Sequence, residues 1–189
     1  YWMRADEENC HRQLPCFDPD FIAKLSIVGY CFFVLGTFVY NRYLTRWSYR
    51  AIYASTQLGM ALFNLLDLVW VLRLNVAAGV PDKAFVLGEE VVGPMLSRFN
   101  TMPLFVLAAM LCPDGVEATN FATIMGLSNF GSSVGDLVGA GLTNALGVEK
   151  HKYDGLPALV VIRALTRLVP IILVPFLVPR GSPSDPEAL

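Results

Sequence analysis

Long apolar runs alternate with short polar segments along the chain. Each run is close to the roughly 20 residues with which an α-helix crosses the apolar core of a bilayer. Asp20 stands before the first run as a suitable helix cap, and Pro157 opens the last run where helices accept proline. The pattern predicts an all-α, polytopic membrane protein with about five transmembrane helices. We place these helices at residues 21–43, 51–72, 82–111, 117–146 and 157–178.

The third apolar run is longer than one bilayer core and contains Gly93-Pro94. Proline removes a backbone N–H donor from a helix, so we expect a kink or a break at this point. In transporters, interrupted helices with charges at membrane depth often mark substrate sites. Glu89, Glu90 and Arg98 flank the expected interruption and are candidates for substrate binding or proton coupling. The alternative is that the start of this run lies at the membrane surface, where water solvates the acids.

The fourth run has a strip of small residues beside a polar face. Gly131, Gly135 and Gly139 recur every fourth residue, and small residues at this spacing let helix backbones approach closely in lipid. We therefore predict helix packing along this strip. Asn129 and Asp136 belong to the neighbouring polar face. An ionised side chain that faces lipid is costly, so Asp136 should face a cavity or a cationic partner.

Counting residues outward from the loops suggests partners for the charges in the spans. Asp136 and Arg167 fall at about the same depth on the fourth and fifth helices, and Arg163 lies one turn from Arg167. We interpret this group either as a structural ion pair or as a site for a substrate carboxylate or a proton. The same counting places Lys24 opposite Asp67, nearer the membrane edge, and predicts a structural ion pair there.

The composition agrees with a membrane protein. Hydrophobic residues make up 54% and charged residues 16% of the chain, against roughly 45–50% and 25% in soluble domains. The formal net charge of -2 gives no indication of nucleic acid as a partner. We expect an extramembrane loop at residues 1–19, a helical bundle in the lipid bilayer at 20–179 and a disordered tail at 180–189. Since the chain begins at Tyr1 and shows no signal-peptide pattern, we expect a fragment whose N-terminal part is missing.

Two of the cysteines share the polar N-terminal segment. Cys10 and Cys16 could form a disulfide if this segment faces an oxidising compartment, and two free thiols are the alternative. Together with His11 they supply too few ligands for a zinc site. The sequence therefore indicates neither a metal site nor a cofactor.

Several short segments occur in an order that is similar to that of one transporter family. They are residues 82–91, 102–103, 111–113, 115–119 and 129–131. The ordered set resembles the folate–biopterin transporter family, a branch of the major facilitator superfamily. The similarity is dense from about residue 81 to residue 141 and thin elsewhere.

The resemblance implies a fold of twelve helices in two six-helix halves, in which this chain would supply helices eight to twelve. It also implies that the segments 42–50 and 112–115 and the tail face the cytoplasm, while residues 1–19 form an external loop. In that fold the third and fourth helices of this chain would line the central cavity. The resemblance therefore favours one set of cavity residues, Glu89, Glu90, Arg98, Asn129 and Asp136, over Asp67, Arg163 and Arg167.

The resemblance further implies a membrane transporter of folates, pterins or related organic anions, and not an enzyme. The expected mechanism is alternating access with proton coupling. A carboxylate can accept paired hydrogen bonds from the amino-pyrimidine edge of a pterin, and an arginine can bind the glutamate tail of a folate. The membrane would be the plasma membrane or an organelle envelope such as that of a plastid.

Two alternatives belong to other classes. Asp67, Asp136 and the segment 157–159 are similar to the two aspartates and the Pro-Ala-Leu motif of intramembrane aspartyl proteases, in which two carboxylates activate water. The match fails because Ser133 stands where that class has glycine. It also fails because the stretch between Asp136 and Pro157 is too short for the additional helix of that class. The other alternative is a relative of the transporters that no longer transports.

Overall fold

The computed structural model describes residues 15–110, 112, 115–149, 152–178 and 180–184, and these residues form helices and no β-strand. The predicted all-α, polytopic membrane architecture is confirmed. The outer boundaries of the apolar runs agree with the expected ones within two residues. The helices are α2 (Pro19–Val39), the π-helix η1 (Tyr40–Leu44), α3 (Tyr49–Val71), α4 (Leu74–Ala77), α5 (Asp82–Met110), α6 (Glu117–Ala145), α7 (Leu156–Thr166) and α8 (Val169–Leu177).

Four of the described stretches are long and apolar enough to cross a membrane, namely α2 with η1, α3, α5, and α7 with α8. α6 has 29 residues, as α5 has, but it is not apolar enough to be among them. Its polar residues, including Asn129 and Asp136, lower its hydropathy. Length and composition thus support four of the expected spans, and α6 as a fifth span stays a prediction.

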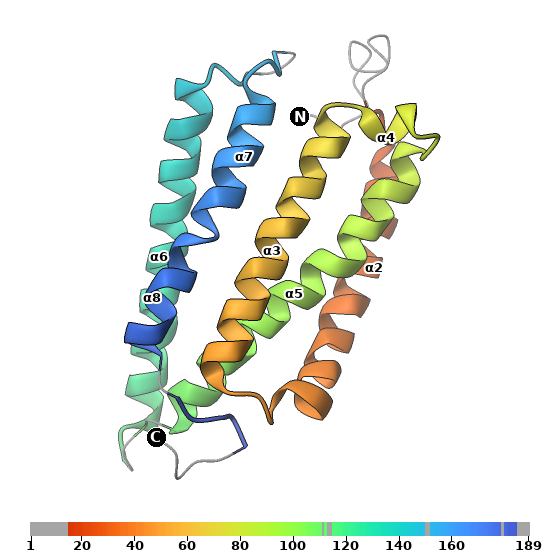
Figure 1. The fold of residues 1–189 in the computed structure, drawn as a ribbon. Coiled ribbons are helices and arrows are strands. Elements are labelled where there is room, and N and C mark those ends of the chain that lie inside the picture. The colour runs from red at the N-terminus through yellow and green to blue at the C-terminus, as the bar shows by residue number, and fades with distance from the viewer. Residues whose placement is uncertain (1–14, 111, 113–114, 150–151, 179, 185–189) are drawn as a thin grey trace.

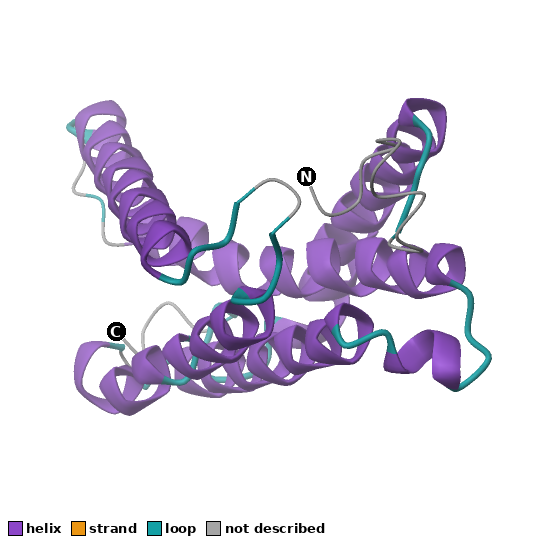
Figure 2. Ribbon diagram, turned by 90° about the horizontal axis from the view of Figure 1, so that it is seen from above, coloured by secondary structure: helices purple, strands orange, loops and turns teal. Residues whose placement is uncertain are grey.

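α5 runs diagonally through the middle of the molecule and separates the other helices into two groups (Figure 1, Figure 2). α3, α7 and α8 lie on one side of it, and α2 and α6 lie on the other. α2 makes its main contacts with α5, and α3 contacts α5, α7 and α8. α6 contacts mainly α5 and has no buried residue. α5 is therefore the wall that the two groups share.

A glycine and an arginine set the close contact between α2 and α5. A Cβ added at Gly36 would lie 3.2 Å from the Cα of Met95 and 3.3 Å from the Cβ of Arg98. Arg98 Nε donates a hydrogen bond to Thr37 Oγ1 at 2.7 Å, and the guanidinium lies 4.6 Å from the centroid of the Phe33 ring. The arginine of α5 therefore holds α2 by a hydrogen bond and a cation–π contact.

The start of α5 is bonded to the end of α3. Arg73 has a left-handed backbone with φ of 60° and turns the chain from α3 into α4. The Asp82 carboxylate accepts hydrogen bonds from Arg73 Nη1 at 2.7 Å, from Asn75 Nδ2 at 2.8 Å and from Trp70 Nε1 at 3.1 Å. Three donors on one carboxylate oxygen fix the position of α5 against α3 at this end of the bundle.

α5 continues as one helix through Pro94 and Pro103. Of the two outcomes expected at Gly93-Pro94, the break does not occur, and the kink stays a prediction. Each proline still removes one backbone donor from the helix. Because α2 and α3 both pack against α5, tertiary contacts support the helix where these hydrogen bonds are missing.

The last apolar run, expected as one helix, is divided. α7 ends at Thr166 and α8 begins at Val169. Pro170 explains the division, because its ring lacks an N–H and clashes with the carbonyl group four residues earlier. At the junction the helix tightens, and Leu168 N donates to Leu165 O at 3.0 Å, three residues back.

The segment before α2 contacts the bundle. Phe17 is buried in a small apolar cluster with side chains of α2, α3 and α5. Cys16 is disulfide-bonded. Cys10, the partner considered from the sequence, lies outside the described residues, as do the first 14 residues of the expected extramembrane loop.

The segment after α8 bonds to the loop between η1 and α3. Tyr49 N donates to Gly181 O at 2.9 Å, and Ser184 N donates to Thr45 O at 3.1 Å. Residues 180–184 therefore have a defined place in the fold. The expected disorder of the tail from residue 180 onward stays a prediction, and residues 185–189 lie outside the described part of the chain.

Candidate functional site

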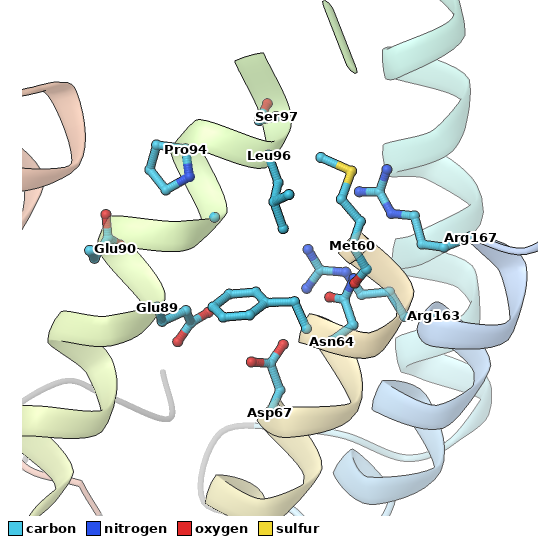
Figure 3. Close-up of a pocket in the computed structure, with 12 residues that line it drawn as sticks. Met60, Asn64, Asp67, Glu89, Glu90, Pro94, Leu96, Ser97, Arg163 and Arg167 are labelled. Atoms are coloured by element: carbon cyan, nitrogen blue, oxygen red, sulfur yellow. The ribbon is translucent and has the colours of Figure 1, made fainter. Parts of the chain in front are cut away.

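A cavity of about 300 Å³ lies between α3, α5 and α7, and we call it the charged cavity (Figure 3). Its charged members are Asp67 from α3, Glu89 and Glu90 from α5, and Arg163 and Arg167 from the region of α7. Neutral residues complete the wall of the cavity. They are Met60, Phe63, Asn64, Gly93, Pro94, Leu96 and Ser97.

The three helices bring their charges to a similar depth. α3 ends, and α5 and α7 begin, at the same end of the molecule (Figure 1). Asp67 lies four residues before the last residue of α3, and Glu89 and Arg163 each lie seven residues after the first residue of their helix. At about 1.5 Å per residue, these positions are roughly 6–10 Å from the helix ends. The charges thus lie inside the apolar spans, nearer one end of the bundle.

One guanidinium serves two carboxylates in the charged cavity. Asp67 and Glu89 each attract Arg163, and they repel each other. Figure 3 shows Asp67, Glu89 and Arg163 extending from three helices toward the same space. Among the described residues, no salt bridge joins the charges of this cavity. The charges are therefore close enough to interact and yet are not closed into an ion pair.

Charged side chains of both signs that are not closed into ion pairs can bind and release a ligand. A guanidinium binds a carboxylate through two parallel N–H···O hydrogen bonds. A carboxylate in an apolar span is costly when it is ionised and without a partner, so it can take up a proton or a hydrogen-bond donor. The charged cavity therefore offers binding chemistry for an organic anion and for protons.

A second cavity of about 300 Å³ lies on the other side of α5, against α2, and we call it the aromatic cavity. Glu90 and Pro94 line both cavities. Glu89 and Glu90 are adjacent, so their side chains leave the helix about 100° apart. The two acids can therefore serve different faces of α5. The contribution of α2 consists of Ser26, Gly29, Tyr30 and Phe33.

The structure groups the candidate residues differently from the sequence-based expectation. Asp67, Arg163 and Arg167, which were expected to pair elsewhere, share a cavity with Glu89 and Glu90. The helix count from the loops did not predict that Asp67 and the two arginines share a cavity. The approach of α5 to α3 and α7 decides the grouping, and this contact depends on the fold as a whole.

Lys24 does not pair with Asp67. Its Nζ forms an exposed salt bridge with Asp20 Oδ2 at 3.2 Å, one turn earlier on α2, so the expected pair with Asp67 is wrong. Residues four apart on a helix are neighbours and need no second helix to meet. Arg98 is not among the residues that line the charged or the aromatic cavity, and it bonds to Thr37 of α2.

The candidate polar residues of α6 lie away from the charged cavity. Asn129 and Asp136 are exposed, and neither lines that cavity. The expected pairing of Asp136 with Arg163 or Arg167 is therefore not formed in the structure. Asp67 and Asp136, the two aspartates of the protease hypothesis, are not brought together either.

The glycine strip of α6 is open. A Cβ added at Gly131, Gly135 or Gly139 would meet no atom within 4 Å. No described residue packs on the strip, so its role in helix packing stays a prediction. The same holds for the binding roles of Asn129 and Asp136.

Sequence reasoning did not single out the aromatic cavity. Tyr30 and Phe33 look like ordinary members of an apolar run, in which aromatic residues are common. Gly29 and Gly36 are the signal that could have found them. Small residues seven apart lie on one face of a helix and mark it for close contact with another helix.

Comparison of the sequence with known proteins identifies the family of the chain. A profile described as the BT1 family matches residues 6–186. The chain belongs to the BT1 family. This BT1 family chain is 35% identical to probable folate-biopterin transporter 4 of Arabidopsis thaliana over 163 residues. The aligned residues are 86% of this chain and 33% of the relative. It is 34% identical to the folate-biopterin transporter of Synechocystis sp. over 169 residues. The aligned residues are 88% of this chain and 34% of the relative.

A more distant relative is folate transporter 1 of Plasmodium falciparum. It is 25% identical over 166 residues, which cover 88% of this chain and 33% of the relative. No solved structure matches the chain. The BT1 family chain spans about a third of the length of these relatives. The family resemblance drawn from the short ordered segments is confirmed.

Proposed function

We propose that the full-length protein that carries this chain transports folates, pterins or related organic anions across a membrane. The chain belongs to an integral membrane family, and several relatives are named as transporters of folate and biopterin. The observation that carries the proposal is the charged cavity, in which charges of both signs lie within apolar spans. Charges in such places are costly and are usually kept for binding or transport.

Either of two membranes fits this proposal. The plasma membrane and a plastid envelope were both expected from the sequence resemblance. Two of the Arabidopsis relatives carry the word chloroplastic in their names. We retain both locations, and localisation of the tagged full-length protein in cells distinguishes them.

α5 is the element on which alternating access would act. It lies between the two helix groups and contributes to both cavities. Pro94 and Pro103 each remove a backbone hydrogen bond, and helices bend most readily at such points. Rocking of one helix group against the other would expose the site to each side of the membrane in turn.

We assign proton coupling to Glu89. Glu89 interacts with Asp67 and Arg163 across the charged cavity and with the adjacent Glu90, and Arg167 lies on the same wall as Arg163. A proton on Glu89 removes the attraction of this acid for Arg163. The guanidinium is then left to Asp67 or to a carboxylate of the substrate. Proton and substrate thus act on the same cation.

Uptake into proteoliposomes that contain the full-length protein tests the transport proposal. We expect tritiated folate or biopterin to accumulate faster under an inwardly directed proton gradient than without a gradient. Accumulation of neither compound above protein-free vesicles would contradict transport. Accumulation that ignores the gradient would contradict proton coupling alone.

Two substitutions test the assigned residues. We expect Glu89→Gln to reduce uptake at least about tenfold, because an amide cannot exchange the proton that releases Arg163. Asp136→Asn should do the same if α6 also faces the pathway. Glu149→Gln is the matched control, since Glu149 is exposed in the loop after α6 and lies outside both cavities. Normal uptake by both test variants, at normal membrane abundance, would refute these roles.

A further inference from the structure

Glu90 is an acid of α5 that has no cationic partner among the described residues. It is half-buried, and no hydrogen bond or salt bridge joins it to any other described residue. It lies against Gly29 of α2, where an added Cβ would lie 2.6 Å from Glu90 Oε2. The carboxylate therefore lies against bare backbone. A ligand that brings N–H donors would satisfy both of its oxygens.

Two aromatic rings, those of Tyr30 and Phe33, line the aromatic cavity together with Glu90. Tyr30 is 73% exposed, so its ring is accessible from the aromatic cavity. Phe33 is half-buried, and its ring also carries the Arg98 guanidinium at 4.6 Å. Figure 3 shows Glu90 and Pro94 on the side of α5 away from the arginines of the charged cavity. A planar ring could enter between the aromatic side chains of α2 and the proline of α5.

Arg98 adds a positive charge outside the aromatic cavity, on the same face of α5. Glu90, Pro94 and Arg98 are spaced four residues apart and share the face of α5 that meets α2. Glu90 and Arg98 are thus about 12 Å apart along the helix axis. Arg98 Nε is bonded to Thr37, and its two terminal nitrogens donate to no described acceptor. These nitrogens can take a carboxylate.

The aromatic cavity is small enough to select a ring. Its volume of about 300 Å³ is at the lower end of the roughly 300–1,000 Å³ of small-ligand pockets. The charged cavity is less suited to a ring with an N–H edge, because Arg163 attracts two of its acids, Asp67 and Glu89. An acid without a cation, two aromatic rings and a distant arginine together match a flat, donor-edged heterocycle with an acidic tail.

Building on the proposed function, we propose that the aromatic cavity is the subsite that recognises the heterocycle of the substrate. Glu90 accepts two neighbouring N–H groups of an amino-pyrimidine edge, and Tyr30 and Phe33 stack on the ring. Arg98 binds a carboxylate of the tail. Ring and tail are then recognised between α2 and α5, while the proton is handled between α5, α3 and α7.

Transport kinetics of the full-length protein in proteoliposomes test this subsite. The substrates are biopterin and folate, each compared with its 2-desamino analogue, which lacks one N–H donor of the edge. We expect the native protein to prefer the 2-amino compounds at least about tenfold in kcat/KM. In Glu90→Gln the amide presents only one acceptor oxygen, so KM for the 2-amino compounds rises at least tenfold and the preference disappears. Asp20→Asn, an exposed acid of α2, is the control.

Two further variants separate the ring from the tail. Tyr30→Ala should raise KM for both 2-amino compounds at least about tenfold, and Tyr30→Phe should restore it because the ring face remains. Phe38→Ala is the control for loss of an exposed ring on α2. Arg98→Gln should raise KM for folate and leave that for biopterin, which has no carboxylate, within about threefold.

The outcomes distinguish the subsite from the transport function. A native protein that moves neither compound refutes the proposed function, and the subsite falls with it. Transport by the native protein with an intact 2-amino preference in Glu90→Gln refutes the subsite alone. Equal losses for the 2-amino and 2-desamino compounds also refute it, since such losses show a structural role for Glu90.

Discussion

Gly29 and Gly36 face the same partner helix but meet different atoms. At Gly29 the nearest atom is the end of the Glu90 side chain, which can rotate away. At Gly36 the nearest atom is the Cα of Met95, which can move only with the backbone of α5. A side chain at the first position therefore displaces an acid, whereas a side chain at the second separates two helices.

Gly36→Ala tests the contact between α2 and α5. We expect it to destabilise the full-length protein by about 1–3 kcal/mol, because an added methyl group overpacks an interface that cannot relax by side-chain rotation. The melting temperature in detergent measures the effect. Gly139→Ala is the matched control, since a Cβ there meets no atom within 4 Å. Equal melting temperatures for both variants would contradict the close contact.

Residue patterns predicted which side chains carry charge but not which of them meet. Lys24 found its partner one turn away on its own helix, because such pairs form without tertiary structure. Asp67 and Glu89 lie on different helices and came together through the crossing of α3 and α5. Crossing positions depend on the packing of whole helices, so they could not be predicted by counting along the chain.

Helices respond to proline according to position. α5 continues through Pro94 and Pro103, whereas Pro170 separates α7 from α8. Helix bounds could be predicted because run length and polarity are local properties of the sequence. Whether a proline divides a helix could not, because α5 has neighbours on two sides that hold it in shape. α7 and α8 pack mainly against one helix, α3.

Pro170→Ala tests the division of the last span. Restoring the N–H should favour one helix across the junction, by up to about 3 kcal/mol for a helix-interior proline. We expect amide exchange between Thr166 and Ile171 to slow about tenfold or more in the full-length protein, measured by hydrogen–deuterium exchange. Pro157→Ala is the control, because Pro157 lies in the first turn of α7, where an N–H has no helical partner. Similar exchange in both variants would contradict this explanation.

At the scale of the whole molecule, α6 stands apart. It has no buried residue, yet it lies on the same side of α5 as α2 (Figure 2). The length of α6 predicted a transmembrane span. Its polar face, however, gives it a lower hydropathy than the four apolar spans have. Its role in the topology therefore decides whether the loop before α7 lies across the membrane from the loop before α6.

Single cysteines in the full-length protein test this topology. Val116→Cys and Ser184→Cys lie at one end of the bundle, and Ala78→Cys and Asp154→Cys lie at the other. In sealed vesicles we expect a membrane-impermeant maleimide to label the first two from one side and the last two from the other, above the signal of the parent protein. Labelling of positions 116 and 154 from the same side would show that α6 does not cross.

Because α5 is a wall of both cavities, movement of α5 changes the width of both at once. A shift of this helix toward α2 narrows the aromatic cavity and widens the charged one, and the opposite shift does the reverse. Occupants on the two sides of α5 are therefore linked thermodynamically. The factor by which a bound proton changes affinity for a heterocycle must equal the factor by which the heterocycle changes affinity for the proton. The position of α5 would thus set the coupling free energy between proton binding and heterocycle binding.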